Sequence, residues 1–379
     1  MLPMLMHSTL NHSTWDVFCH VVDNLGDVGV CLRLARGLAA LGQSVRLFID
    51  DSTALSWMAP QPTSGVTVLP WHEANRVMPG AVVVEAFGCN PPSAFVAAMT
   101  GQAPPPLWIN VEYLSAEPYV ERSHGLPSPQ AGGLTKWFFY PGFTLRTGGL
   151  LREAGLLQAQ TVFDRDAWLA ARGAARLAGE RVVSLFSYAN PALPTLLKRL
   201  AEQPTLLLLT AGQAVPDNLQ RAMRGWRGLG GLQGFGGLRV QRLPLLSQSE
   251  FDKLLWACDL NFVRGEDSLV RAIWAGAPFV WQIYPQHDGA HAVKLQAQLT
   301  AAKAPPDVAA FCWAWNGLGT SQGLPPWPDM PGWQAAASAW RGELVQQPDL
   351  ATQLLAFAKA KTLGQASPGS TPGGTPGRC

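Results

Sequence analysis

The stretch WDVFCHVVDNLGDVGVCLRLARGLAALGQSVRLFI, residues 15–49, decides the fold. Its first apolar run, Val17–Val22, predicts a buried strand, and the amphipathic run Val30–Leu41 predicts a helix that stops at Gly42. A second apolar run, Val45–Ile49, predicts another strand. A strand, a turn, a helix and a further strand make one unit of a parallel sheet, so the sequence predicts an α/β protein.

The same alternation continues along the chain in two halves. In the first half, further strands are expected at Thr67–Leu69, Ala81–Glu85 and Leu107–Val111. The Gly- and Pro-rich stretch Ser123–Gly149 then predicts a long loop. In the second half, strands are expected at Val182–Phe186, Leu206–Leu209, Leu238–Leu243, Leu260–Val263 and Pro278–Ile283. Ser247 and Glu250 have the spacing of a capping box and predict a helix that runs to Ala257.

Two α/β halves in series predict two Rossmann-like domains with a ligand site in the crevice between them. We expect the following division: a flexible N-terminus at 1–14, an N-terminal domain at 15–165, a C-terminal domain at 180–345, a C-terminal helix at 346–364 and a disordered tail at 365–379. In such domains ligands bind at the carboxyl ends of the strands, where the chain turns into the following helix.

The composition disfavours several classes of protein. The 379 residues carry 28 Lys and Arg against 26 Asp and Glu, a net charge of +2, and no basic run, which disfavours a nucleic-acid or anionic-membrane partner. No apolar run approaches the roughly 18 residues of a membrane span. The six cysteines show no paired or metal-ligating spacing, so we expect reduced thiols in a cytoplasmic protein. The 15 tryptophans have no explanation at this level.

The first turn of interest, Asp23–Gly29, follows the first strand and opens a helix. It lacks the glycine spacing and the lysine of phosphate-binding loops, and its two carboxylates would repel a pyrophosphate. Asp23 and Asp27 instead suit a cationic or proton-releasing group. Asp27 could equally be an ordinary helix N-cap, and both roles can coexist because a cap uses only one carboxylate oxygen.

The second turn, Arg264–Ser268, has the matching position in the second half. Ser268 and the N–H groups at a helix start can hold a diphosphate, Arg264 can neutralise it, and Glu266 can accept hydrogen bonds from ribose hydroxyls. A capping cluster with an Arg–Glu pair is the alternative. Aromatic and polar residues predicted on the same rim favour a ligand site: Phe186, Tyr188, Gln248 and Phe251.

A metal site is not supported by the sequence. His287 and His291 have i, i+4 spacing, but the segment lacks the glutamate of the HExxH motif and contains a glycine that weakens a helix. We therefore expect a solvated helix start there.

At these motifs the chain resembles the arginine rhamnosyltransferases that modify bacterial elongation factor P, a family of inverting glycosyltransferases with the GT-B architecture. The resemblance covers about Trp15 to Leu363. It is carried by VVDNLGDVGVCLRLAR, VVVEAFGCNPP, WINVEYLSAEPYVERSHGLPSP, FFYPGFTLRTGGLLRE and NFVRGEDSLVRAIWAGAPFVWQIYPQ. The departures are mild: Leu25 stands where the family pattern leads us to expect Phe, and Gln282 where we expect His.

The resemblance implies an α/β fold with two Rossmann-like domains that face an interdomain cleft. It implies that the C-terminal half binds dTDP-β-L-rhamnose as co-substrate, without a metal or other cofactor, and that the N-terminal half docks elongation factor P. Asp27 matches the proposed general base of the family and Asp23 its acidic companion. The donor-binding residues implied are Phe186, Tyr188, Gln248, Phe251, Arg264, Glu266, Asp267 and Ser268.

The chemistry of these residues fits that reaction. An arginine acceptor has a pKa above about 12, so a carboxylate orients the guanidinium and accepts its proton only as the C–N bond forms. Two alternatives remain open from the sequence: a GT-B transferase for another sugar nucleotide and acceptor, or a protein that binds a translation factor without chemistry.

Overall fold

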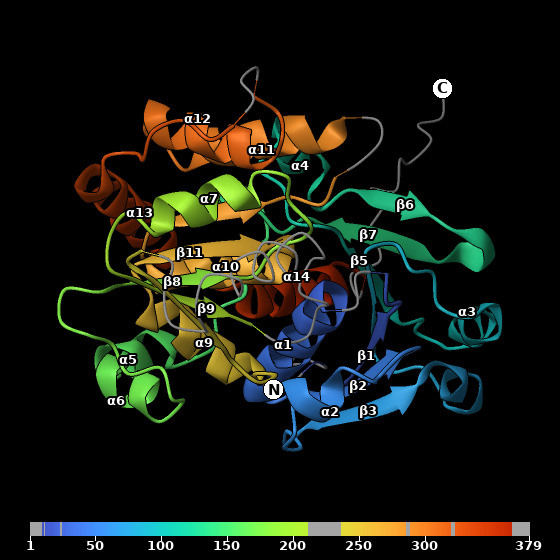
Figure 1. Cartoon of the computed structure of the whole chain (residues 1–379). Coiled ribbons are helices and arrows are strands. Elements are labelled where there is room, and N and C mark those ends of the chain that lie inside the picture. Colours follow the sequence, from blue (N-terminus) through green and yellow to red (C-terminus); the bar gives the residue numbers. More distant parts are fainter. Residues whose placement is uncertain are drawn as a thin grey trace, which may run out of the picture.

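A computed structural model describes residues 10, 12–22, 25–210, 236–285, 289–319 and 323–365. The chain forms two halves, each built on one sheet, which lie side by side (Figure 1). The predicted flexible N-terminus and disordered tail lie largely outside the described residues. Within the described ranges, no helix is both long and apolar enough to cross a membrane.

The first sheet has the order β3-β2-β1-β4-β5-β7-β6 and is parallel except for β6. Its strands are β1 Thr14–Cys19, β2 Ser44–Ile49, β3 Val66–Pro70, β4 Val82–Ala86, β5 Leu107–Val111, β6 Pro127–Pro129 and β7 Thr135–Phe139. The second sheet is parallel throughout, in the order β10-β9-β8-β11-β12. Its strands are β8 Arg181–Leu185, β9 Thr205–Leu209, β10 Leu238–Arg242, β11 Leu260–Arg264 and β12 Phe279–Gln282. The predicted α/β class is therefore confirmed.

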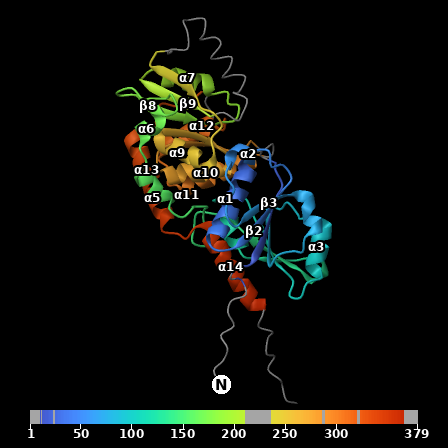
Figure 2. The same cartoon turned by 90° about the horizontal axis from the view of Figure 1, so that it is seen from below.

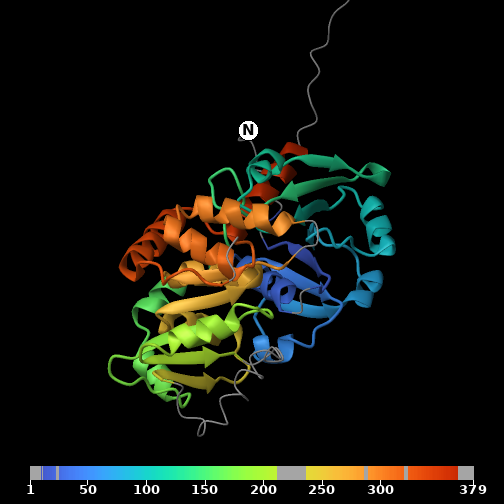
Figure 3. The same ribbon diagram turned by 45° about the horizontal axis from the view of Figure 1, so that its top comes forward.

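Helices cover both sheets. Those of the first half are α1 Gly26–Ala40, α2 Leu55–Met58, η1 Trp71–Arg76, α3 Ser93–Thr100, α4 Pro118–Ser123 and η2 Ala131–Gly133. Those that follow are α5 Leu156–Thr161, α6 Arg165–Ala170, α7 Leu193–Leu200, α9 Gln248–Ala257, α10 Gly265–Ala275, α11 Ala290–Ala301, α12 Pro306–Trp315, α13 Met330–Val345 and α14 Leu350–Gln365. Figure 3 shows the orange helices α11 and α12 over the second sheet.

The last helix, α14, returns to the first half. Its apolar residues Leu350, Leu354 and Ala358 are buried in the same core as Val17 and Leu34, and α14 lies next to α1 (Figure 2). A C-terminal helix was expected from the sequence, but its packing against the N-terminal sheet was not. The chain thus crosses between the halves twice.

Two expectations about strands were wrong. The first strand runs from Thr14 to Cys19 rather than from Val17 to Val22. It includes the buried Asp16, which accepts from the Arg46 guanidinium at 2.6 and 2.8 Å and from the Gly80 N–H at 2.6 Å. A charged residue in a strand breaks the apolar pattern that the sequence offers. The expected loop Ser123–Gly149 contains β6 and β7, and β7 pairs with β5.

The tryptophans find their explanation in the cores. Among the described residues eight are buried: Trp15, Trp108, Trp168, Trp274, Trp281, Trp315, Trp333 and Trp340. Several of their indole N–H groups donate to an acceptor, which offsets the cost of burying them. Trp274 donates to the Leu151 carbonyl at 2.7 Å, which ties α10 to the segment between the halves.

A buried ion pair joins β4 and β7 and yields a stability prediction. Glu85 accepts from Lys136 at 2.6 Å and from the Trp108 indole at 3.2 Å, and its side chain is fully buried. Lys136→Met leaves the carboxylate without its cation and is expected to cost about 3–5 kcal/mol of unfolding free energy. Urea denaturation measures this loss, and Lys136→Met combined with Glu85→Gln should recover at least half of it. A single variant within about 1 kcal/mol of the parent would contradict the prediction.

Candidate active site

A pocket lies between the two halves. From the C-terminal half it is lined by six of the eight expected donor residues: Phe186, Gln248, Phe251, Arg264, Asp267 and Ser268, together with Thr210 and Leu246. From the N-terminal half it is lined by Leu25, Gly26, Arg33, Trp57 and Met58. The sequence therefore identified most of the wall that the second half contributes, whereas Arg33, Trp57 and Met58 were missed.

The C-terminal wall combines aromatic rings with a buried positive charge. The rings of Phe186 and Phe251 meet edge to face with centroids 5.5 Å apart. The Arg264 guanidinium lies 4.6 Å from the Phe186 ring and 4.3 Å from the Tyr188 ring, and Arg264 is only 2% exposed. Tyr188 is not among the pocket residues but contacts one of them, Arg264. Rings beside a cation suit a ligand that carries both a base and an anion.

The second turn belongs to a helix. The sequence led us to expect Glu266 and Asp267 in a loop before a helix that starts at Ser268. Helix α10 instead starts at Gly265, so both residues lie in its first turn. Gly265 has φ 70°, a left-handed conformation that glycine adopts without strain, and its carbonyl accepts from the Trp281 indole at 2.9 Å. The start of α10, with its partial positive charge, therefore lies at the pocket beside Arg264.

The N-terminal side of the pocket is the start of α1. Leu25 and Gly26 line the pocket, and Asp27, the next residue, is 4% exposed. The hypothesis that Asp27 caps the helix is wrong, because α1 follows Leu25, which gives no side-chain cap. Instead Asp27 is the second residue of α1 and accepts a hydrogen bond from the Val22 N–H at 2.9 Å. Asp23 lies outside the described residues.

Glu266 points away from this pocket toward a smaller neighbouring one. Its carboxylate accepts from the Leu114 N–H at 2.8 Å and from Lys294 at 2.5 Å. The smaller pocket is also lined by Phe87 and Glu112, at the carboxyl ends of β4 and β5. Phe87 stacks on Tyr113 with centroids 4.2 Å apart, and burial raises the pKa of Glu112. Phe87 and Glu112 were not predicted as site residues, although each directly follows an apolar strand.

Gln248 and Asp267 also bind the N-terminal half. The Gln248 amide donates to the Gly29 carbonyl at 2.9 Å and accepts from Arg36 at 3.0 Å. Asp267 pairs with the Arg33 Nε at 3.0 Å. Two of the expected donor residues thus hold the two halves together as well as lining the pocket. Gln282, where we expected His, is buried at the end of β12.

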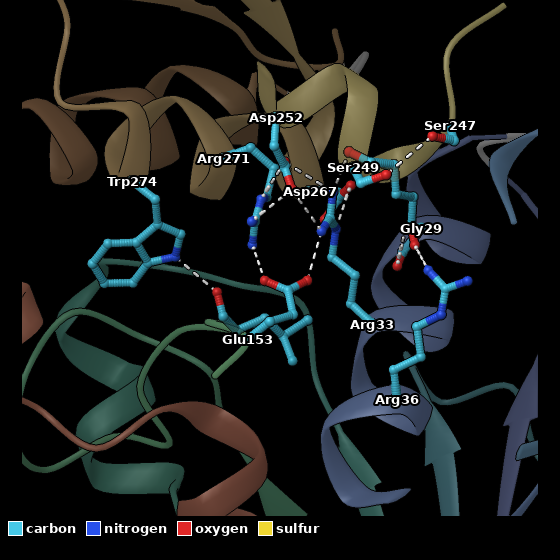
Figure 4. A network of polar contacts seen from close by, with 12 residues as sticks. Gly29, Arg33, Arg36, Glu153, Ser247, Ser249, Asp252, Asp267, Arg271 and Trp274 are labelled. Carbon is cyan, nitrogen blue, oxygen red and sulfur yellow. Dashed lines mark hydrogen bonds and ion pairs between the residues drawn. The ribbon is translucent and has the colours of Figure 1, made fainter. Parts of the chain in front are cut away.

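Arg33 belongs to a buried ionic network, shown in Figure 4. It contacts Asp252 at 3.1 Å and Glu153 at 2.6 Å. Arg271 binds the same two carboxylates, Asp252 at 2.7 and 2.9 Å and Glu153 at 2.8 Å. In Figure 4 the Glu153 carboxylate lies between the two guanidinium groups. The network joins α1, the segment before α5, α9 and α10, and nothing in the local sequence predicts it.

The charges of the network shift one another's pKa values. Burial alone would lower the pKa of Arg33, but Asp252, Asp267 and Glu153 outweigh it and raise the pKa. Burial raises the pKa of Asp267, and Arg33 and Arg271 oppose that shift. Arg33 therefore keeps its charge throughout the physiological pH range.

Glu153 gives a pH prediction. Burial would raise its pKa, but Arg271 and Arg33 outweigh burial and lower it from 4.5 to about 2. A lowered carboxylate pKa adds stability that is present above pH 4.5 and is lost as the pH falls toward 2. Glu153→Gln should therefore lower the unfolding free energy at pH 7, and the difference from the parent should shrink at pH 3. Denaturant titrations at both pH values measure it, and a difference that stays constant would contradict the prediction.

Across the described part of the chain, no group of three or more His, Cys, Asp or Glu side chains has a metal-binding arrangement. His291 lies in the first turn of α11, consistent with the helix expected there, whereas His287 lies outside the described residues.

Nearly the whole chain is similar to proteins of one family. Residues 15–359 match the family described as "Elongation-Factor P (EF-P) rhamnosyltransferase EarP". The chain is 44% identical to the protein-arginine rhamnosyltransferase of Pseudomonas aeruginosa, over 91% of this chain and 98% of that protein. It is 45% identical to that of Pseudomonas putida over the same shares, and 36% identical to that of Neisseria meningitidis over 90% and 96%.

Structural comparison agrees. The structure described as "Structural basis for EarP-mediated arginine glycosylation of translation elongation factor EF-P" matches with a TM-score of 0.62 and 32% identity, over 92% of this chain and 99% of that one. UGT89C1 of Arabidopsis thaliana, solved with UDP, matches with a TM-score of 0.52 at 11% identity, over 92% and 99%, which concerns the fold alone.

Proposed function

Since this chain belongs to the family of elongation factor P rhamnosyltransferases, EarP, we propose that it transfers L-rhamnose from dTDP-β-L-rhamnose to an arginine side chain of elongation factor P, with inversion at the anomeric carbon. The family membership makes it a glycosyltransferase with the GT-B architecture expected from the sequence. The choice of donor, acceptor, stereochemistry and cytoplasmic location is the proposal.

The observation that carries the proposal is the pocket with opposite chemistry on its two sides. One side has the aromatic rings, Arg264 and the start of α10, and the other has the start of α1, where the buried carboxylate Asp27 directly follows the lining residues Leu25 and Gly26. The first side suits a nucleoside diphosphate, the second a cation.

For the donor, we place thymine at Phe186, Tyr188 and Phe251, and the diphosphate at Arg264 and the start of α10. Gln248, Asp267 and Ser268 line the same pocket, and Glu266 begins the same helix. As the glycosidic bond breaks, negative charge grows on the leaving diphosphate. Arg264 and the N–H groups of α10 can stabilise that charge, a role that needs no metal ion.

For the acceptor, the guanidinium is protonated before the reaction. Asp27, with Asp23 as its companion, orients the planar group and takes one proton as the new C–N bond forms. Nitrogen attacks the anomeric carbon on the face opposite the diphosphate, through an oxocarbenium-like transition state. The proton goes to Asp27, the bonding electrons go to the leaving dTDP, and the anomeric configuration inverts.

Intact-mass measurement tests the function. The protein is incubated with elongation factor P and dTDP-rhamnose, and the acceptor should gain the mass of one deoxyhexose. A parallel thermal-shift series with UDP-, ADP- and dTDP-sugars tests the donor. Stabilisation by another sugar nucleotide but not by dTDP-rhamnose would overturn the donor, and binding of elongation factor P without a mass gain would favour a non-catalytic binding protein.

A further inference from the structure

Helices α1 and α10 lie against each other across the cleft, and each carries part of the proposed site. Asp27 is at the start of α1, and four of the proposed donor residues, Arg264, Glu266, Asp267 and Ser268, are at the start of α10. Their contact is close at Gly29, because a Cβ atom there would lie 3.1 Å from the Asp267 carboxylate oxygen. The separation of the two helix starts therefore depends on this contact.

Arg33 lies one turn after Gly29 on α1 and makes most of the polar contacts between α1 and the segments packed against it at this point. Its side chain is 3% exposed and reaches three carboxylates on three segments: Asp267 on α10, Asp252 on α9 and Glu153 before α5. The planar guanidinium fixes the relative orientation of these segments as well as supplying a positive charge, because its nitrogens donate in different directions to different carboxylates. Figure 4 shows this side chain reaching from the α1 ribbon to the opposite helices.

We propose that Arg33 is a positioning residue, which holds α1 and its Asp27 in register with the donor-binding start of α10. The inference rests on the proposed function, because it concerns the distance between the proposed base and the donor. It goes beyond that function, because Arg33 itself takes no part in the bond changes.

Two further contacts make this arrangement specific. Gln248 bonds the Gly29 carbonyl, two residues from Asp27, and also lines the donor pocket. Asp267 likewise contacts both Arg33 and the pocket. The contacts that hold α1 against α9 and α10 therefore lie directly beside the pocket. An error of about 1 Å in the approach of acceptor to donor can cost about 100-fold in rate.

The test separates positioning from general stability by comparing kcat with donor affinity. We would make Arg33→Lys, which keeps the charge but loses the planar fork, and Arg33→Met, which loses both. With full-length protein, dTDP-rhamnose and elongation factor P, kcat should fall about tenfold for Lys and about 100-fold for Met. The Kd for dTDP, measured by calorimetry, should rise by much less than kcat falls, because Arg33 lines the pocket but most of the proposed donor residues belong to the C-terminal half.

Arg46→Gln is the matched control. Arg46 also forms a bidentate pair with a buried carboxylate, Asp16, but within one sheet. It should lower the unfolding midpoint and leave kcat unchanged. If Arg33→Met does not fold, Arg33→Lys and Glu153→Gln carry the test, since Glu153 bridges Arg33 to Arg271 and its loss should also lower kcat.

Three outcomes overturn the inference: an Arg33→Lys kcat within about twofold of the parent, a loss in dTDP affinity as large as the loss in kcat, or an equal kcat loss in Arg46→Gln. A parent protein that fails to transfer rhamnose refutes the proposed function instead.

Small-angle X-ray scattering still tests the positioning in that case. Arg33→Met with dTDP should have a larger radius of gyration than the parent, and an identical one would overturn the inference.

Discussion

Asp27→Asn is expected to abolish most transfer while leaving donor binding intact. The amide oxygen of Asn can still accept the hydrogen bond from Val22, so the turn before α1 should keep its shape. The substitution removes the negative charge that we propose orients the guanidinium, and the proposed base that takes its proton. Loss of a general base typically costs about 10²–10⁴ in rate. Single-turnover transfer to elongation factor P, followed by intact mass, measures the loss.

Asp50→Asn is the control for this variant. Asp50 accepts a hydrogen bond from Val21, the neighbour of Val22, at 2.9 Å, so it is an acid of similar local role at the same edge of the sheet. It should transfer at the parent rate. The thermal shift given by dTDP should be equal in both variants and the parent. If Asp27→Asn lost that shift together with transfer, Asp27 would belong to the donor side.

Arg264→Met is expected to weaken donor binding at least tenfold and to lower kcat by about 10²-fold. Met keeps part of the side chain's volume against Phe186 and Tyr188 but removes the charge that we propose faces the diphosphate. Loss of a group that stabilises developing charge costs about 10²–10³ in kcat. Calorimetric titration with dTDP and saturation kinetics with dTDP-rhamnose separate the two effects.

Arg181→Met is the matched control, because Arg181 also lies over an aromatic ring, that of Trp327 at 5.0 Å, in the same half. Arg181 is at the start of β8, whereas Arg264 ends β11, so the two lie at opposite ends of the second sheet. Arg181→Met should leave dTDP affinity unchanged. Equal losses in both variants would show that the Arg264 effect is one of folding rather than of donor contact.

The Lys136 and Glu153 variants test buried ion pairs, which the pattern of apolar residues along the sequence does not predict. Strand β7 was predicted as loop because its five residues, TKWFF, begin with two polar ones and follow a Gly- and Pro-rich stretch. Lys136 is nevertheless buried in that strand, because Glu85 on β4 and the Trp108 ring neutralise and cover it. A local sequence pattern carries no information about an ion-pair partner that lies 51 residues away along the chain.

The sequence by itself determined the α/β class with two mainly parallel sheets, most strands to within a few residues, and most of the C-terminal wall of the pocket. These follow from apolar runs and from turns at strand ends, which are local features. Tertiary structure alone decided that α14 returns to the first sheet, that Asp27 lies inside α1 rather than capping it, and that Gln248 and Asp267 bind α1 as well as lining the pocket. It also created the Arg33 network, whose partners lie 120 to 234 residues away. The physical reason is that ion pairs depend on where side chains meet after folding, whereas strand and helix patterns depend on neighbours along the chain.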